Sequence, residues 1–214
     1  MKIKLLSIVT AIIIAVLVIS AAVTFTLQDR MAYKRFLVKV DLPAAVGISE
    51  EEILANYNAL IDYNSVFFRG PLVFPTLPMS EAGQIHFEEV KNIFSGLQIA
   101  LIVSVILTAL LAAFLFRKRR HWFLALGGIL TLAIPAAVVG LMAAVGWDRF
   151  FVLFHELFFN NDFWVFDAST DPVIMILPDA FFLNCLVRIV FAIVVSGILL
   201  IVCPYLLKRI SREG

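Results

Sequence analysis

Apolar residues are concentrated in four long runs, and polar segments separate these runs. The runs cover residues 5–27, 97–116, 122–145 and 187–207. A helix needs about 20 residues to cross a hydrocarbon core of about 30 Å, and each run reaches that length. The pattern therefore predicts an all-α polytopic membrane protein with four transmembrane helices. We expect one membrane domain over residues 1–214.

The composition agrees with this class. The chain has 214 residues, of which 62% are hydrophobic and 15% are charged, and its mean hydropathy is +1.01. A soluble globular domain is typically less than half apolar and about one quarter charged. The composition therefore excludes an ordinary soluble domain.

Basic side chains predict how the helices are oriented. They lie before the first run, between the second and third, and after the fourth (Lys2, Lys4, Arg117, Lys118, Arg119, Arg120, Lys208, Arg209 and Arg212). Cytoplasmic flanks of membrane helices carry an excess of Lys and Arg. One threading satisfies this rule at all three places, with both termini inside. The segments 28–96 and 146–182 then lie outside, where we expect a mostly helical cap.

The acidic residues follow the same asymmetry. Fifteen of the sixteen Asp and Glu residues fall in the two outer segments, and only Glu213 lies inside. The net charge of +1 conceals this distribution and gives no indication of nucleic acid binding. We therefore expect no nucleic acid partner.

The first apolar run also has features of a secretory signal, because small residues interrupt it at Ser20, Ala21 and Ala22. Signal peptides usually have an apolar core of about 7 to 15 residues. This run is longer and continues past the small residues. A retained membrane anchor is the better interpretation.

The first outer segment contains two predicted helices. Ser49 and Glu52 form the sequence pattern of a capping box, and apolar residues then recur on one helical face until about Asn64. Ser80 is the expected N-cap of a second helix, which continues toward the second membrane span. Before these helices, alternation over residues 36–40 indicates a short strand.

Between the two helices lies an apolar stretch, Phe67 to Pro78, that contains Pro71, Pro75 and Pro78. Proline lacks a backbone N–H and disfavours helix in the residue before it, so no regular helix is expected. Exposure of such an apolar loop to water is unfavourable. We expect it to enter the headgroup region of the membrane or to line a lipid-facing groove.

The second outer segment combines phenylalanines with carboxylates. A helix is predicted up to residues 160–162, followed by extended chain around Trp164 and Phe166. Asp171 before Pro172 has the pattern of an N-cap followed by proline, and the fourth membrane helix should begin after Pro178. Charges in hydrocarbon are costly unless they are paired or hydrated. The segment therefore indicates a polar site at a membrane surface.

Two of the three histidines, His86 and His155, fall in different outer segments. A single histidine at a membrane interface is usually an amphipathic surface residue without a catalytic role. Here each histidine has a carboxylate within three residues, Glu89 or Glu156, and histidine is the commonest general acid and base near neutral pH. His86 and Glu89 share one helical face and are expected to hydrogen-bond. We predict an acid–base site. The third histidine, His121, extends the basic anchor.

Standard hydrolytic motifs are absent from the sequence. It has no G-x-S-x-G elbow, and the run from His155 begins like H-E-x-x-H but lacks the second histidine. A metal held by His86, His155 and one carboxylate remains an alternative, although no spacing favours it.

Three stretches together resemble one family. They are H-F-E-E-V-K-N from His86, F-H-E-L-F-F from Phe154, and W-V-F-D-A-S-T-D-P-V-I-M-I-L-P from Trp164. Between four spans of this topology, they resemble the lipoprotein intramolecular transacylases of low-GC Gram-positive bacteria. The aspartate-rich D-x-S-T-D-P element is the most specific part.

The resemblance implies an acyltransferase in the bacterial cell membrane, with its active site on the extracytoplasmic side. Its substrate would be a diacylated lipoprotein, whose sn-2 acyl chain moves to the α-amine of the N-terminal cysteine. The product would be a lyso-form lipoprotein. No cofactor is implied, and membrane lipid is the other expected partner.

The resemblance also implies that His86 and His155 carry the chemistry. We expect His86, paired with Glu89, to act as the base and His155 to assist the leaving group or the oxyanion. Supporting roles are expected for Arg149, Ser169 and Thr170 as oxyanion donors and for Asp167 and Asp171 in the aspartate-rich element. A metal-dependent membrane hydrolase and a non-catalytic membrane partner protein are the alternatives.

Overall fold

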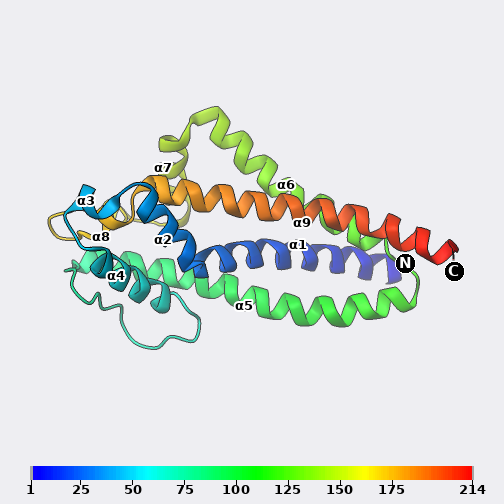
Figure 1. Cartoon of the computed structure of the whole chain (residues 1–214). Coiled ribbons are helices and arrows are strands. Elements are labelled where there is room, and N and C mark those ends of the chain that lie inside the picture. The colour runs from blue at the N-terminus through cyan, green and yellow to red at the C-terminus, as the bar shows by residue number, and fades with distance from the viewer. Residues whose placement is uncertain (1, 214) are drawn as a thin grey trace. The chain divides into compact units, whose positions relative to one another are not determined.

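The computed structural model describes residues 2–213, apart from the side chains of residues 207, 208 and 210–213. Over this range the chain is helical and contains no strand (Figure 1). The helices are α1 (Lys2–Gln28), α2 (Arg30–Lys39), α3 (Leu42–Val46), α4 (Glu50–Tyr63), α5 (Glu81–Arg117), α6 (Trp122–Val145), α7 (Trp147–Phe158), α8 (Val173–Ile176) and α9 (Asp179–Glu213).

The chain divides into two compact units. Unit 1 comprises Met1–Thr24, Leu97–Val145 and Val187–Gly214, and unit 2 comprises Phe25–Gly96 and Gly146–Leu186. Four helices are long and apolar enough to cross a membrane: α1, α5, α6 and α9 over Asp179–Leu206. The prediction of an all-α protein with four candidate spans is confirmed. The single-domain organisation stays a prediction.

Unit 1 packs through apolar and small residues. Ile14 of α1, Leu115 of α5 and Phe123 of α6 are buried in one cluster. Gly128 of α6 approaches α9 so closely that a Cβ atom there would lie 2.5 Å from the carbonyl oxygen of Gly197. Small residues allow such close backbone approach between membrane helices.

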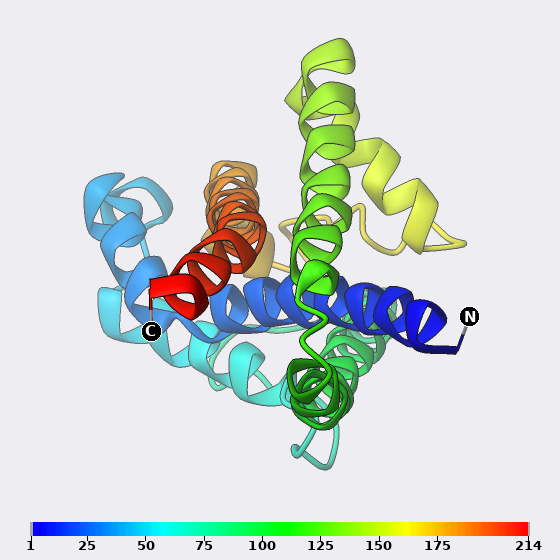
Figure 2. The ribbon, with the colours of Figure 1, turned by 90° about the vertical axis from the view of Figure 1, so that its right-hand side faces the viewer.

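Three parts of unit 1 share one end. The start of α1, the turn between α5 and α6, and the end of α9 lie at the same end in Figure 1, and all three face the viewer in Figure 2. These are the places where the basic residues cluster. Lys208, Arg212 and Glu213, which entered the topology prediction, have side chains outside the described residues.

The core of unit 2 is built around Tyr33 of α2. Its ring stacks on Tyr57 of α4 at 3.6 Å between centroids, and its hydroxyl donates a 2.6 Å hydrogen bond to the carbonyl of Ile176 in α8. The strand predicted over residues 36–40 is wrong, because this region belongs to α2. Tyr33 and Leu37 are both buried at helical spacing, and Asp29 caps the helix by accepting from the backbone N–H of Ala32.

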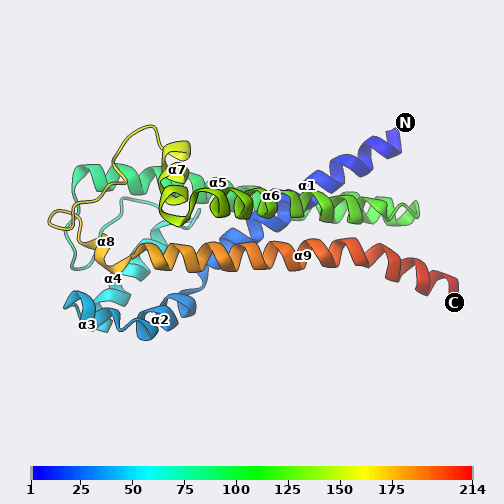
Figure 3. The same cartoon turned by 90° about the horizontal axis from the view of Figure 1, so that it is seen from above.

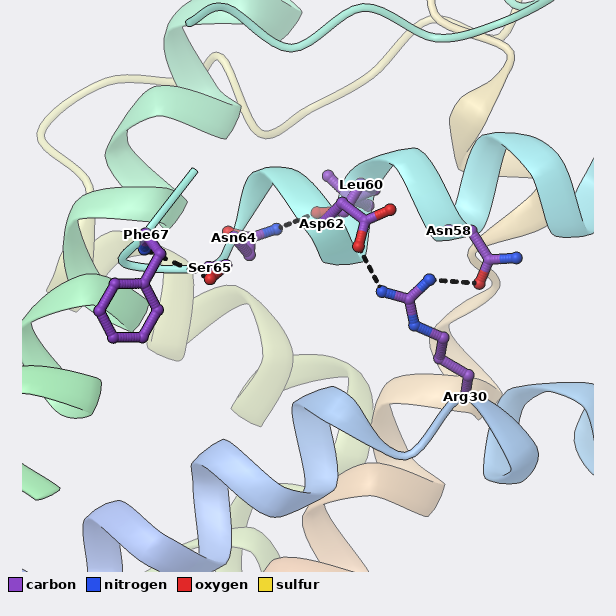
Figure 4. A network of polar contacts seen from close by, with 7 residues as sticks. All are labelled: Arg30, Asn58, Leu60, Asp62, Asn64, Ser65 and Phe67. Atoms are coloured by element: carbon purple, nitrogen blue, oxygen red, sulfur yellow. Dashed lines mark hydrogen bonds and ion pairs between the residues drawn. The ribbon is translucent and has the colours of Figure 1, made fainter. Parts of the chain in front are cut away.

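The predicted helix from Ser49 to Asn64 is confirmed as α4. The Ser49 side chain accepts a hydrogen bond from the backbone N–H of Glu52, and Asn64 is the C-cap. Arg30 at the start of α2 reaches α4, where it donates to Asn58 and pairs with Asp62 (Figure 4). These contacts bring α2 and α4 side by side.

Residues 64–80 contain no regular helix, as the prolines predict. Leu72 and Phe74 are buried in the core of unit 2, whereas Val73 between them is 71% exposed. Phe67 is also exposed. The stretch therefore turns apolar side chains both inward and outward, and its contact with lipid stays a prediction.

Ser80 caps α5 as predicted, because its hydroxyl oxygen accepts from the backbone N–H of Gly83. The predicted capping role of Asp171 is wrong. Its buried carboxylate does not cap α8 but accepts hydrogen bonds from the backbone N–H of Ser80 and from the Thr170 hydroxyl, both at 2.8 Å. Asp171 thus fastens the loop between α7 and α8 to the start of α5.

Gly83→Ala should break this attachment, because a Cβ atom at Gly83 would lie 2.4 Å from the Asp171 carboxylate oxygen. Leaving a buried hydrogen-bonding group unsatisfied costs about 1–3 kcal/mol. Gly96→Ala on the same helix is the matched control, since no atom lies within 4 Å of its Cβ position. We expect thermal unfolding of the purified protein to show a lower Tm for Gly83→Ala than for Gly96→Ala. Equal Tm values would contradict the attachment.

Candidate functional site

His86 and His155 lie next to each other within unit 2. His86 is near the start of α5, before its apolar run, and His155 is in the last turn of α7. Their ring centroids are 6.2 Å apart. The two outer segments of the chain therefore supply one histidine each to a single site.

Aromatic rings surround the pair. Phe159, the C-cap of α7, has its ring centroid 4.7 Å from His86 and 5.7 Å from His155. Phe166 meets His86 edge-on at 5.4 Å, and Trp164 stacks on His155 at 4.6 Å. His86 is only 6% exposed, while His155 is half-buried. The two imidazoles are therefore packed among aromatic rings, and His86 is largely shielded from water.

This environment keeps both imidazoles neutral at pH 7. Burial, with a smaller contribution from the neighbouring His155, lowers the pKa of His86 to about 4. Burial also lowers the pKa of His155, partly opposed by its hydrogen bond to the Phe151 carbonyl. Desolvation disfavours the charged form of a base, which accounts for both directions.

The hydrogen bond of His155 fixes its tautomer. Its Nδ1 lies 2.7 Å from the carbonyl oxygen of Phe151, one turn earlier in α7. A carbonyl can only accept, so Nδ1 carries the proton. In the neutral ring, Nε2 then holds the free lone pair, and His155 is oriented as a proton acceptor.

The predicted hydrogen bond between His86 and Glu89 is wrong. Glu89 Oε1 instead accepts a 2.9 Å hydrogen bond from the side-chain amide of Asn161, in the loop after α7. His86 Nδ1 is buried without a hydrogen-bond partner among the described residues. Both residues share one face of α5, but the His86 ring packs against Phe159 and Phe166 while Glu89 is held by the loop.

Three polar atoms around the histidines are buried and have no partner within the described part of the chain: His86 Nδ1, Glu89 Oε2 and Trp164 Nε1. Buried polar groups are nearly always hydrogen-bonded, and exceptions call for an explanation. His86 is one of the two imidazoles, Trp164 stacks on the other, and Glu89 lies one turn after His86 in α5. Such a cluster is typical of a site that completes its hydrogen bonds with a ligand.

The other predicted site residues lie in different arrangements. Arg149 is exposed and faces Glu156 at 3.9 Å. The Ser169 hydroxyl and backbone N–H both donate to Asp167, which lowers the pKa of that exposed carboxyl group. The Thr170 hydroxyl donates to Asp171 at 2.8 Å. Both hydroxyl protons are thus engaged within the loop, and the supporting roles of these residues stay predictions.

Extended chain was predicted around Trp164, but residues 163 and 164 form a turn and residue 165 a bend. Figure 3 shows the loop that leaves α7 and continues to α8. Within this loop, Trp164 stacks on His155. Sequence reasoning missed the roles of Trp164 and Asn161. The only local signal was the polar run of residues 160–162 before a tryptophan, in a segment otherwise rich in phenylalanine.

Among the described residues, no three His, Cys, Asp or Glu side chains gather closely enough to hold a metal ion. The proposed set of His86, His155 and a carboxylate therefore does not form a three-ligand cluster in this arrangement.

Comparison with known proteins identifies the chain. The family described as lipoprotein intramolecular transacylase Lit matches residues 8–182. The solved structure of the membrane-integral lipoprotein intramolecular transacylase Lit from Bacillus cereus is similar over 100% of this chain and 99% of that one, with 33% identity and a TM-score of 0.95.

Two further structures of the Bacillus cereus protein are also similar. One carries a histidine-to-arginine mutation (32% identity, TM-score 0.88, 100% and 95% of the two chains), and one a histidine-to-alanine mutation (32%, 0.89, 100% and 96%). No curated protein sequence matches the chain. With its four apolar helices, its histidine pair and a match over most of its length, the chain belongs to the lipoprotein intramolecular transacylase family and is a multi-pass membrane acyltransferase.

Proposed function

We propose that this enzyme moves the sn-2 O-acyl chain of a diacylglyceryl lipoprotein to the α-amine of its N-terminal cysteine. The observation that carries the proposal is the pairing of His86 and His155 at 6.2 Å within an aromatic, water-poor environment. Such a pair can accept and donate protons during the reaction, while the surrounding apolar surface accommodates acyl chains. Lyso-form lipoprotein is the product.

In this mechanism His155 is the base. The bond between Nδ1 and Phe151 leaves Nε2 free to accept a proton. As the amine nitrogen attacks the sn-2 ester carbonyl, a C–N bond forms and Nε2 takes one amine proton. When the tetrahedral intermediate collapses, the C–O bond breaks and His155 returns that proton to the glyceryl oxygen. This reverses the roles expected from sequence, where His86 was the base.

His86 supports the oxyanion. Because its pKa is lowered to about 4, the ring stays neutral, and a neutral imidazole still carries one N–H donor. A neutral histidine can polarise a carbonyl without transferring a proton. The buried N–H of Trp164 is a second donor of the right kind.

No covalent enzyme intermediate is required. The amine and the ester are parts of one molecule, and well-oriented intramolecular reactions reach effective molarities of about 10⁵–10⁸ M. The absence of a serine elbow from the sequence is consistent with this route.

The site is proposed to face the extracytoplasmic side of the bacterial cell membrane, within a cap formed by the two outer segments. The start of α1, the basic α5–α6 turn and the end of α9 lie at one end of unit 1, as the positive-inside rule requires of a cytoplasmic end. Around the site, Phe154, Leu157 and Phe158 of α7 are exposed apolar side chains suited to a membrane surface.

The acyl transfer is tested by mass spectrometry of the N-terminal lipopeptide of a reporter lipoprotein, expressed with the enzyme in a host that otherwise leaves the amine free. The total mass should be unchanged, and fragmentation should place one chain on the amine. Loss of one chain would indicate a hydrolase, and an unmodified diacyl peptide would favour a binding role.

In the same assay, His155→Ala should reduce the rate by about 10²–10⁴-fold, the usual contribution of a general base. His86→Ala should cost about 10²–10³-fold, as expected for one oxyanion donor. His121→Ala is the control, because that ring packs on Phe116 at the α5–α6 turn. Wild-type activity in either of the first two variants, with normal membrane content, would remove that histidine from the mechanism.

The pH profile follows from the two lowered pKa values. Both imidazoles lose their protons below pH 6.5, so neither should limit the rate between pH 6.5 and 8. The substrate α-amine has a pKa of about 7.7–8.0 and must be neutral to attack. We expect kcat/KM to rise across this range with the titration of the amine. A histidine-dependent inflection at or above pH 6.5 would contradict this assignment.

Topology is tested by single cysteines in a background without Cys185 and Cys203. On intact cells, a membrane-impermeant maleimide should label Ser169→Cys in the α7–α8 loop but not Lys118→Cys in the α5–α6 turn. Permeabilised cells should show labelling of both. Labelling of Lys118→Cys alone on intact cells would invert the proposed orientation.

A further inference from the structure

One carboxylate oxygen of Glu89 is buried and accepts no hydrogen bond from the described residues. Asn161 Nδ2 donates to Oε1 at 2.9 Å, which fixes the orientation of the group. Oε2 is buried and has no partner among the described residues. An ionised carboxylate accepts at both oxygens, so one of the two oxygens of Glu89 has no hydrogen bond.

None of the ion pairs among the described residues involves Glu89. Lys91 is two positions away, but its ammonium group lies 4.1 Å from the Tyr63 ring centroid and donates to the Phe68 carbonyl. Arg69 is bonded to nearby backbone carbonyls, including that of Phe68. Glu89 is half-buried, and its Oε2 is shielded from water without a cation beside it among the described residues, so a positively charged ligand group would be stabilised here.

We propose that Glu89 Oε2 binds the α-amino group of the substrate's N-terminal cysteine. This inference rests on the proposed function, which makes that amine the acyl acceptor. Two of the buried atoms without a hydrogen-bond partner among the described residues differ in what they can bind. Trp164 Nε1 is a donor and can bind an oxygen of the substrate. Glu89 Oε2 is an acceptor that bears negative charge and can bind an N–H group. Glu89 thus recognises the amine in either protonation state, since both carry N–H donors.

The position of Glu89 fits this role. It lies three residues after His86 and therefore on the same face of α5, one turn along the helix. Its partner Asn161 follows Phe159, the residue that contacts both imidazoles. An amine held by Glu89 would be close to the histidine pair. Glu89 is therefore assigned to the binding and orientation of substrate, in place of the expected hydrogen bond to His86.

The experiment measures binding to two unreactive probes. Both are diacylglyceryl lipopeptide analogues in which ether linkages replace the esters, so neither can be transferred. One has a free N-terminal amine and the other an N-acetyl group. A hydrogen bond to a charged group contributes about 1.5–3 kcal/mol, so the wild-type enzyme should bind the free amine about 10–100-fold more tightly.

Glu89→Gln removes the charge but keeps an oxygen that can accept from Asn161. We expect this variant to lose most of the preference for the free amine, chiefly through weaker binding of that probe. Glu89→Asp should keep part of it. Glu88→Gln is the matched control, because Glu88 is exposed and bonded to Gln84, and it should keep the wild-type preference. Thermal unfolding verifies that all variants are folded.

An undiminished preference in Glu89→Gln, or no preference in the wild-type enzyme, would overturn the inference. Because the probes do not react, these outcomes are independent of turnover. Acyl transfer to the amine is judged separately from the wild-type lipopeptide mass. If the wild-type enzyme transfers the chain but Glu89→Gln keeps the full preference for the free amine, this inference is refuted and the proposed function is not.

Discussion

The contact of Phe159 with both imidazoles is the interaction on which the site depends. Phe159 is 6% exposed and ends α7, so the same residue that stops the helix also packs on His86 from α5. Aromatic rings in such contact exclude water from the histidines. Removal of water lowers both pKa values and leaves the imidazoles as neutral donors and acceptors.

A second constraint holds the two segments of unit 2 together. The Asp171 carboxylate bonds to the backbone at the start of α5 and to Thr170 in its own loop. Gly83 leaves room for this carboxylate, because any side chain there would collide with it. The loop that carries Trp164 and Phe166 is therefore anchored at the helix that carries His86. Within the aspartate-rich element, Asp171 is therefore the residue that attaches this loop to the start of α5.

Local patterns predicted most of the helices, and the errors have physical causes. Length and hydropathy sufficed for four spans, and caps sufficed for α4 and α5 because a cap is formed within a few residues. Five alternating residues at 36–40 were too few to distinguish strand from helix, and Tyr33 and Leu37 show the helical period. The predicted hydrogen bond between His86 and Glu89 is not formed, because a shared helical face does not determine where each side chain points.

The sequence by itself determined the membrane class, the helical fold, and which residues are chemically able to act, since these depend on composition and on near neighbours. Only the tertiary structure decided that His86 and His155 lie next to each other and that the Nε2 of His155 keeps a free lone pair. It also decided that Asn161 bonds to one oxygen of Glu89 and leaves the other without a hydrogen bond among the described residues. Each of these contacts joins side chains through packing and hydrogen-bond geometry in the folded chain. The pKa values follow from that packing, because burial belongs to the fold and not to the residue type.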